Sequence, residues 1–236
     1  MKAAPAALPS AVLFDMDGTL VDTEVLWWET AREVAAGLGH RLGDADAPEV
    51  VGRAVADTAA HLIEVTGGGA SAPHGTPADR ASALARTAAE LTDSFFRKVD
   101  TGAPLRPGAA ALLASLEGAG VPFALVSASP RSVVDAVVAG SLAGVDFAFT
   151  LSADDTVRTK PHPDPYRAAA ERFAADPAAC VAVEDSPDGT ASADAAGCAV
   201  LVVPSLLPVA PGRARTFARS LEEVDLGLLS DCLRRP

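Results

Sequence analysis

The sequence of 236 residues has little lysine, little cysteine and no long uninterrupted apolar run. Acidic residues outnumber basic ones by 31 to 19, which gives a net charge of −12. Because nucleic-acid binding relies on a basic surface, this balance argues against DNA or RNA as a partner. A membrane-spanning helix needs about 20 predominantly apolar residues. The chain has no such stretch and no polybasic segment, so we expect no membrane partner either.

The cysteines and the N-terminal segment bear on the compartment. Cys180, Cys198 and Cys232 lack the spacing of metal ligands, and their number is odd and low. Such usage is typical of a reducing compartment, so we expect a cytoplasmic protein. Residues 1–13 (MKAAPAALPSAVL) contain one lysine, and two prolines interrupt them. We interpret this segment as a short tail followed by a strand, and not as an export signal.

Five short apolar runs end abruptly at polar residues. They cover residues 11–15, 121–129, 147–155, 180–186 and 198–205. Each has the length of a strand and is almost continuously apolar, which is typical of a parallel sheet covered on both faces. Helical patterns alternate with these runs at residues 107–120, 129–144, 164–175 and 186–197. The alternation predicts a doubly wound α/β fold, in which ligands bind at the carboxyl ends of the strands.

One region interrupts this alternation. Between about Thr23 and Gly102 the sequence shows amphipathic helical patterns at residues 24–39, 56–67 and 79–99, and a flexible loop is expected at 67–78. We therefore expect an all-α domain at residues 23–102. It would be inserted into an α/β core formed by residues 1–22 and 103–236, with hinges near residues 21–23 and 101–107.

Polar residues gather where the predicted strands end. Asp15 and Asp17 follow the first strand, Ser127 ends the second, and Glu184 and Asp185 end the fourth. Each has an ordinary structural explanation, because Asp is common in turns, Ser caps helices and acids stabilise helix N-termini. Taken together, however, two of these carboxylates offer the oxygen ligands that Mg²⁺ prefers.

Lys160 and Gly18 extend this pattern. The chain has only two other lysines, Lys2 and Lys98, so Lys160 departs from its general use of arginine. A compact ammonium is a good partner for a phosphate or a carboxylate, although a solvated surface charge is the alternative. Gly18 would let the backbone approach such a ligand closely.

The order of these motifs resembles the haloacid dehalogenase superfamily, in its phosphatase and phosphomutase branch. DMDGTLVDTE resembles the first motif of the family, LVSAS the second, TKPHPDPY the third and VEDSPDGTASADAAG the fourth. The resemblance covers nearly the whole chain. It implies a Rossmann-like core, a helical cap after the first motif, Mg²⁺ as cofactor and a small phosphorylated metabolite as partner. The implied activity is hydrolysis of phosphate monoesters, with sugar phosphates favoured, through an aspartyl-phosphate.

The resemblance also implies a role for each residue. Asp15 would be the nucleophile, and Asp17 would act first as general acid and then as general base. Mg²⁺ would be held by Asp15, the main-chain carbonyl of Asp17 and Asp185, with Glu184 acting through a water. The groups implied for holding the phosphoryl group are Ser127, Lys160 and the backbone N–H groups of Asp17 and Ala128.

The helical insert leaves alternatives open. β-Phosphoglucomutase-like enzymes place a histidine where this chain has Trp27, so the resemblance favours a phosphatase, and a sugar phosphomutase is the alternative. Trp27 and Trp28 are adjacent, so only one can face the core of the insert. Trp27 is a candidate to contact the substrate, and the alternative is that both tryptophans pack between the helices of the insert. Arg53 matches a cap loop that faces the active site in the family, and an exposed arginine without such a role is the alternative. A catalytically inactive metabolite-binding protein is the alternative of another class.

Overall fold

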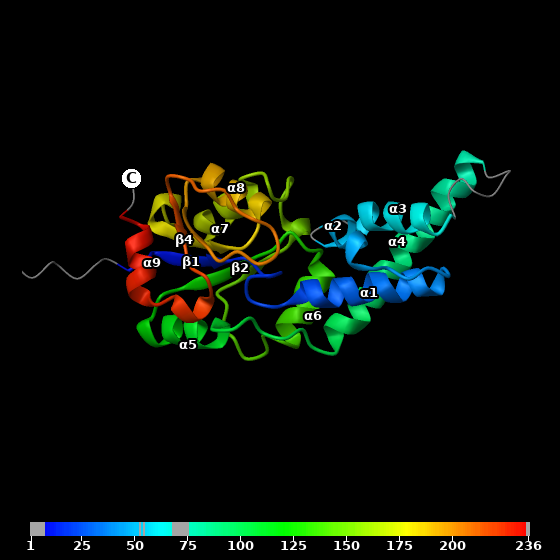
Figure 1. Ribbon diagram of the computed structural model, residues 1–236. Helices are drawn as coiled ribbons and strands as arrows, with labels where there is room; N and C mark the ends of the chain where they lie inside the picture. Colours follow the sequence, from blue (N-terminus) through cyan, green and yellow to red (C-terminus); the bar gives the residue numbers. More distant parts are fainter. Residues whose placement is uncertain (1–7, 52, 54, 68–75, 235–236) are drawn as a thin grey trace, which may run out of the picture. The chain divides into compact units, whose positions relative to one another are not determined.

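The computed structural model describes residues 8–51, 53, 55–67 and 76–234 (Figure 1). The expected tail at residues 1–7 and most of the loop expected at 67–78 lie outside the described residues. The chain divides into two compact units. One consists of Met1–Asp22 and Pro104–Pro236, and the other of Thr23–Ala103.

The first unit is built on a parallel sheet of six strands in the order β3-β2-β1-β4-β5-β6. The strands are β1 (Ala11–Phe14), β2 (Phe123–Val126), β3 (Thr150–Leu151), β4 (Cys180–Glu184), β5 (Ala199–Val202) and β6 (Arg215–Phe217). Strand β1 pairs with both β2 and β4, and Val12 lies opposite Phe123 on one side and Val181 on the other. From β1 the chain adds β2 and β3 on one side of the sheet and then returns to add β4, β5 and β6 on the other side. The topological switch point, where ligands bind in such sheets, therefore lies between the carboxyl ends of β1 and β4. The predicted doubly wound α/β fold is confirmed.

Helices cover both faces of this sheet. They are α5 (Ala109–Ala119), α6 (Arg131–Ala139), α7 (Asp164–Arg172), α8 (Pro187–Ala196) and α9 (Leu226–Cys232), with short 3₁₀ helices η2 (Ala153–Asp155), η3 (Pro177–Ala179) and η4 (Leu221–Glu223). Helices α7 and α8 lie on one side of the sheet and α5 on the other (Figure 1). All residues of β1, β2 and β4 are buried, as the continuous apolar runs predict.

The third predicted strand is much shorter than the apolar run at 147–155. Only Thr150–Leu151 pairs with β2, because Ser152 and Asp155 form a capping box that begins η2 directly afterwards. Strand β6 and helix α9 were not predicted, because their segments are only three and seven residues long.

The second unit is helical in its described residues. It contains α1 (Thr23–Gly37), the 3₁₀ helix η1 (Asp44–Asp46), α2 (Ala47–Val50), α3 (Val55–Val65) and α4 (Pro77–Asp100). Helix α4 begins with a capping box between Thr76 and Asp79, with Pro77 at its first position. Apolar side chains of α1, α3 and α4 form the core of this unit, including Val34, Leu62 and Leu91.

The two linkers that join the units run side by side in the first unit. Val21 and Leu105 form an antiparallel bridge, and the backbone N–H of Asp22 donates to the carbonyl of Pro104 over 2.8 Å. The carboxylate of Asp22 also lies 3.7 Å from the guanidinium of Arg106. The chain therefore leaves and re-enters the α/β core at adjacent points.

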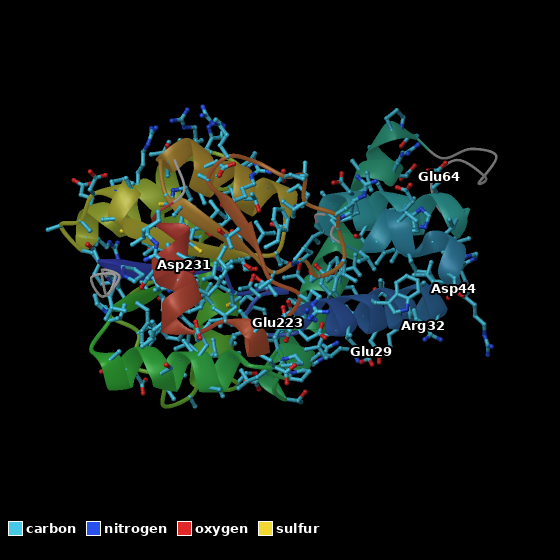
Figure 2. All side chains as sticks on the ribbon, turned by 60° about the vertical axis from the view of Figure 1, so that its left-hand side comes forward. Glu29, Arg32, Asp44, Glu64, Glu223 and Asp231 are labelled. Carbon is cyan, nitrogen blue, oxygen red and sulfur yellow. The ribbon has the colours of Figure 1, made fainter. Side chains whose placement is uncertain are left out.

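Part of the excess of acidic residues is exposed to solvent. Exposed carboxylates lie on the helical unit at Glu29, Asp44 and Glu64, and on the α/β core at Glu223 and Asp231 (Figure 2). None of the helices in the described ranges is both long and apolar enough to cross a bilayer.

Candidate active site

The loop after β1 brings two sequence motifs into contact. Asp15 follows Phe14 directly, is 6% exposed, and donates its backbone N–H to the carbonyl of Val183 over 3.0 Å. Gly18 has a φ of 82°, which favours glycine, and a Cβ at this position would lie 2.2 Å from Oδ2 of Asp185. Glycine is therefore required both by the backbone conformation and by the close approach of this loop to Asp185.

Lys160 forms the centre of a buried ionic cluster. Its ammonium donates to Oδ1 of Asp15 and to Oε1 of Glu184, each over 2.6 Å. The side chain of Lys160 is only 4% exposed and that of Glu184 is fully buried. Lys160 is therefore not a solvated surface charge. Its two carboxylate partners compensate the cost of burying the ammonium.

Burial and neighbouring charges shift the pKa values of Asp15 and Lys160. Burial raises the pKa of Asp15 well above its ordinary value; the ammonium of Lys160 opposes this rise, and Glu184 and Asp185 add to it. Burial alone would lower the pKa of Lys160, but the carboxylates of Asp15 and Glu184 raise it above its ordinary value. Lys160 is therefore charged at neutral pH, and its ammonium is paired with two carboxylates, those of Asp15 and Glu184.

The same carboxylates fit a divalent metal ion. Ligand oxygens of Asp15, Glu184 and Asp185 lie within 4.8 Å of one another. Among the residues that the structure describes, Oδ2 of Asp15 is buried without a hydrogen-bond partner. An unpaired buried oxygen is costly unless a cation binds it, and a hard ion such as Mg²⁺ prefers oxygen ligands. The donor set, its excess negative charge and this oxygen fit Mg²⁺.

The loop after β2 places two hydroxyls on Asp17. The hydroxyl of Ser127 donates to Oδ2 of Asp17 over 3.3 Å, and that of Ser129 donates to the same oxygen over 2.7 Å. Ala128 is exposed between them, and the backbone N–H of Ser129 donates to the hydroxyl of Ser127 over 2.9 Å. Sequence analysis missed Ser129, although two serines in a Ser-Ala-Ser sequence at a strand end were the available signal.

Two further side chains hold the carboxylates at the carboxyl end of β4. The phenol of Tyr166 donates to Oε1 of Glu184 over 2.5 Å, and the hydroxyl of Ser205 donates to Oδ2 of Asp185. Sequence analysis missed both. Tyr166 lies within a helix and Ser205 lies beyond β5, so their contacts with β4 depend on tertiary packing.

An ion-pair network braces the loop that carries the two serines. The backbone N–H of Arg131, at the start of α6, donates to Oδ2 of Asp154 over 2.8 Å, and its guanidinium pairs with Asp155. Asp155 also accepts from the backbone N–H and the hydroxyl of Ser152, over 2.7 and 2.6 Å. The network thus ties the end of β3 to the start of α6.

Asp155→Asn is expected to destabilise the protein by about 1–2 kcal/mol at neutral pH, since one pKa unit corresponds to about 1.4 kcal/mol. Burial alone would raise the pKa of Asp155, but hydrogen bonds from Ser152 and the pairing with Arg131 lower it from 3.8 to about 2. A lowered pKa in the folded state stabilises the protein above the unfolded pKa, and this contribution is lost as the pH falls through the folded pKa.

Urea unfolding of the wild type and of Asp155→Asn at pH 7 and pH 2.5 checks this expectation. The difference in unfolding free energy should shrink markedly at the lower pH. Asp135→Asn is the control, because Asp135 pairs with the same Arg131 but its side chain is 65% exposed. An equal loss for Asp155→Asn at both pH values would contradict the interpretation.

Comparison with known proteins identifies the family. Residues 9–197 match the family model of haloacid dehalogenase-like hydrolases. The chain belongs to this family of enzymes. The resemblance that the four motifs indicate is thereby confirmed, and the strand-end cluster is the candidate active site of a haloacid dehalogenase-like hydrolase.

Similar proteins match this hydrolase over most of its length. Hexitol phosphatase A of Escherichia coli K12 is 33% identical over 231 residues, which cover 92% of this chain and 89% of the relative. The bifunctional riboflavin kinase/FMN phosphatase of Arabidopsis thaliana is 30% identical over 200 residues, or 84% of this chain, and the match spans about half (49%) of that protein. The solved structure of CbbY from Rhodobacter sphaeroides in complex with phosphate has a TM-score of 0.70 at 26% identity, and the match covers 92% of this chain and 96% of that one.

The two residues of the hydrolase that were predicted to contact substrate from the helical insert lie within the helical unit. Trp27 is buried, its ring packs edge-on against Phe95 at 5.4 Å, and its N–H donates to the carbonyl of Val50 over 2.9 Å. Trp27 therefore packs in the helical core with its one donor already used. Arg53 is exposed, and its guanidinium lies within 3.1 Å of the carbonyl of Pro48.

Proposed function

We propose that the protein is a Mg²⁺-dependent phosphatase that hydrolyses small sugar-phosphate monoesters through an aspartyl-phosphate on Asp15. The contact that carries this proposal is the buried ammonium of Lys160 on Asp15, next to an Asp15 oxygen without a partner in the described part of the chain. This arrangement fixes one carboxylate oxygen and leaves the other for a cation or a reacting group. The names of the relatives, hexitol phosphatase A and CbbY in complex with phosphate, favour sugar-phosphate chemistry.

The chemistry needs two transfers of the phosphoryl group. An oxygen of Asp15 attacks phosphorus, the bond from phosphorus to the sugar oxygen breaks, and Asp17 gives its proton to that oxygen. Asp17, now a carboxylate, then takes a proton from a water that attacks phosphorus. The bond between Asp15 and phosphorus breaks, which releases inorganic phosphate and restores both carboxyl groups. Ser127 and Lys160, with the backbone N–H groups of Asp17 and Ala128, hold the phosphoryl group in line.

Asp15, Asp185 and the main-chain carbonyl of Asp17 would hold Mg²⁺, with Glu184 acting through a water. When bound, the ion would neutralise charge on the phosphoryl oxygens. Asp185 is oriented for this role by the hydroxyl of Ser205. We assign the phosphoryl transfer to the α/β core, residues 1–22 and 103–236. We assign the selection of a small phosphorylated metabolite to the helical cap, residues 23–102.

Asp185→Ala is expected to weaken Mg²⁺ binding more strongly than Glu184→Gln. Asp185 is the proposed direct ligand, whereas loss of a group that acts through another ligand or a water typically costs about 10–100-fold. Isothermal titration calorimetry with Mg²⁺ measures both. Asp188→Ala is the control, because it removes an exposed acid from the first turn of α8 without touching the cluster. Full turnover in excess chelator would contradict the metal assignment.

The phosphomutase alternative has the same chemistry at Asp15 and differs in the acceptor, which is a sugar hydroxyl in place of water. The histidine that mutases carry in the cap is Trp27 here, whose single N–H donates to Val50 and which has no acceptor. A residue of this kind cannot exchange protons with a sugar hydroxyl. We therefore favour water as the acceptor.

Phosphorus NMR of β-glucose 1-phosphate, with and without a trace of the 1,6-bisphosphate, separates the candidates. We expect free phosphate to accumulate in both samples. Faster accumulation of glucose 6-phosphate that depends on the bisphosphate would establish the mutase instead. A protein that also fails to release phosphate from p-nitrophenyl phosphate with Mg²⁺ present would be the inactive metabolite-binding protein.

A further inference from the structure

Tyr166 is the single tyrosine of the chain, and no part of it is exposed. It lies on α7 within the apolar cluster that this helix forms against the sheet, together with residues such as Leu13 and Ala193. A tyrosine in such a place needs a partner for its hydroxyl, and the acceptor is Glu184.

Glu184 is held at both carboxylate oxygens. Its Oε1 accepts from the phenol of Tyr166 over 2.5 Å and from the ammonium of Lys160 over 2.6 Å. Its Oε2 accepts from the backbone N–H of Asp185 and from the hydroxyl of Ser186, each over 3.3 Å. The two shortest bonds share Oε1, so the phenol and the ammonium together determine how this carboxylate is turned.

Tyr166 also contacts Lys160 through its ring. The ammonium lies 5.1 Å from the ring centroid, within the range of a cation–π contact. The same ammonium donates to Asp15 over 2.6 Å. Tyr166 therefore acts on Lys160 in two ways, directly through the ring and indirectly through Glu184.

We infer that Tyr166 is a positioning residue that keeps the ammonium of Lys160 on Asp15. The phenol donates to Glu184 and offsets part of its negative charge, so Glu184 competes less strongly for the ammonium in this poorly solvated interior. The ring limits the movement of Lys160 on its side. The consequence for turnover rests on the proposed function, in which Asp15 is the nucleophile.

Tyr166→Phe removes the hydroxyl and keeps the ring. We expect its kcat on p-nitrophenyl phosphate to fall about 10-fold or more, with KM changed much less, because the ester does not contact the phenol. Calorimetric binding of fluoroberyllate with Mg²⁺, which mimics an aspartyl-phosphate without turnover, should weaken as well. The matched control is Ser230→Ala, which deletes a buried hydroxyl that donates to the carbonyl of Leu226 on α9. Equal kcat and equal fluoroberyllate affinity in the two variants would overturn the inference.

A second measurement does not depend on whether Tyr166→Phe folds. Because the chain has one tyrosine, growth with 3-fluorotyrosine labels Tyr166 alone. The fluorine resonance is expected to differ between the labelled wild type and labelled Asp15→Asn without any ligand, since the ammonium shifts away from the uncharged amide of this variant and toward Glu184. Identical resonances would overturn the inference. A wild type that releases no phosphate would instead refute the proposed function, and the fluorine comparison would still decide whether Tyr166 senses the Lys160–Asp15 pair.

Discussion

Asp15→Asn is expected to lower turnover by at least about three orders of magnitude while the protein remains folded. An amide is a poor nucleophile, and each factor of ten corresponds to about 1.4 kcal/mol in the activation barrier. Asparagine has the size of aspartate, and the ammonium of Lys160 remains paired with the buried Glu184, so the protein should stay folded. Steady-state release of p-nitrophenol, together with thermal unfolding followed by circular dichroism, measures both parts of this expectation.

The control for Asp15→Asn is Asp188→Asn, which makes the same chemical change at an exposed position. It should retain wild-type turnover. If purified Asp15→Asn turned over near the wild-type rate, the aspartyl-phosphate mechanism would be refuted.

Lys160→Met is expected to cost both turnover and stability. The change leaves Asp15 and Glu184 buried without their counter-charge, and removing one partner of a buried ion pair typically costs about 3–5 kcal/mol. Without the ammonium, which lowers the pKa of Asp15, burial should raise the folded-state pKa of this carboxyl still further above its unfolded value. The stability deficit should therefore shrink as the pH falls and Asp15 takes up a proton. Mg²⁺ is expected to restore part of the stability at neutral pH, because the proposed metal site would place positive charge beside the same carboxylates.

Lys98→Met provides a matched control, since Lys98 pairs with Glu33 over 2.8 Å at an exposed site on the helical unit. Its loss should cost at most about 1 kcal/mol and should not depend on Mg²⁺. Urea unfolding of both variants at pH 7 and pH 5, with and without Mg²⁺, makes the comparison. Equal destabilisation of the two variants would show that Lys160 does not compensate the buried carboxylates.

The sequence predicts the residues of the site that belong to strand ends. Asp15, Ser127 and Asp185 follow apolar runs, and the carboxyl ends of parallel strands meet at one edge of the sheet. The burial of Lys160 could not be predicted in this way. Its loop has no periodic pattern, and its partners Asp15 and Glu184 are 145 and 24 residues away in the sequence.

The residues that were not predicted from the sequence lie on other elements and reach the site only because those elements pack against the sheet. Ser205 reaches Asp185 from the loop after β5, and Tyr166 reaches Glu184 from α7. A helical pattern predicts that a residue such as Tyr166 faces the core but does not say which strand it meets. The same limit applies to Trp27, because the pattern allows either tryptophan of the pair to be buried.

The adjacent linkers at Val21 and Leu105 also have a consequence for the order of folding. Strands β1 and β2 are neighbours in the sheet, yet the whole helical unit separates them in sequence, so their pairing must close a long loop. Closing a loop costs entropy that grows with its length, and contacts between residues distant in sequence form slowly. Within the helical unit, α1 and α4 pack against each other, which brings the two ends of the unit together. Once that unit has formed and its ends have met, only a short free segment separates β1 from β2. The rate at which the edge of the sheet with the candidate active site assembles therefore depends on the stability of the helical unit.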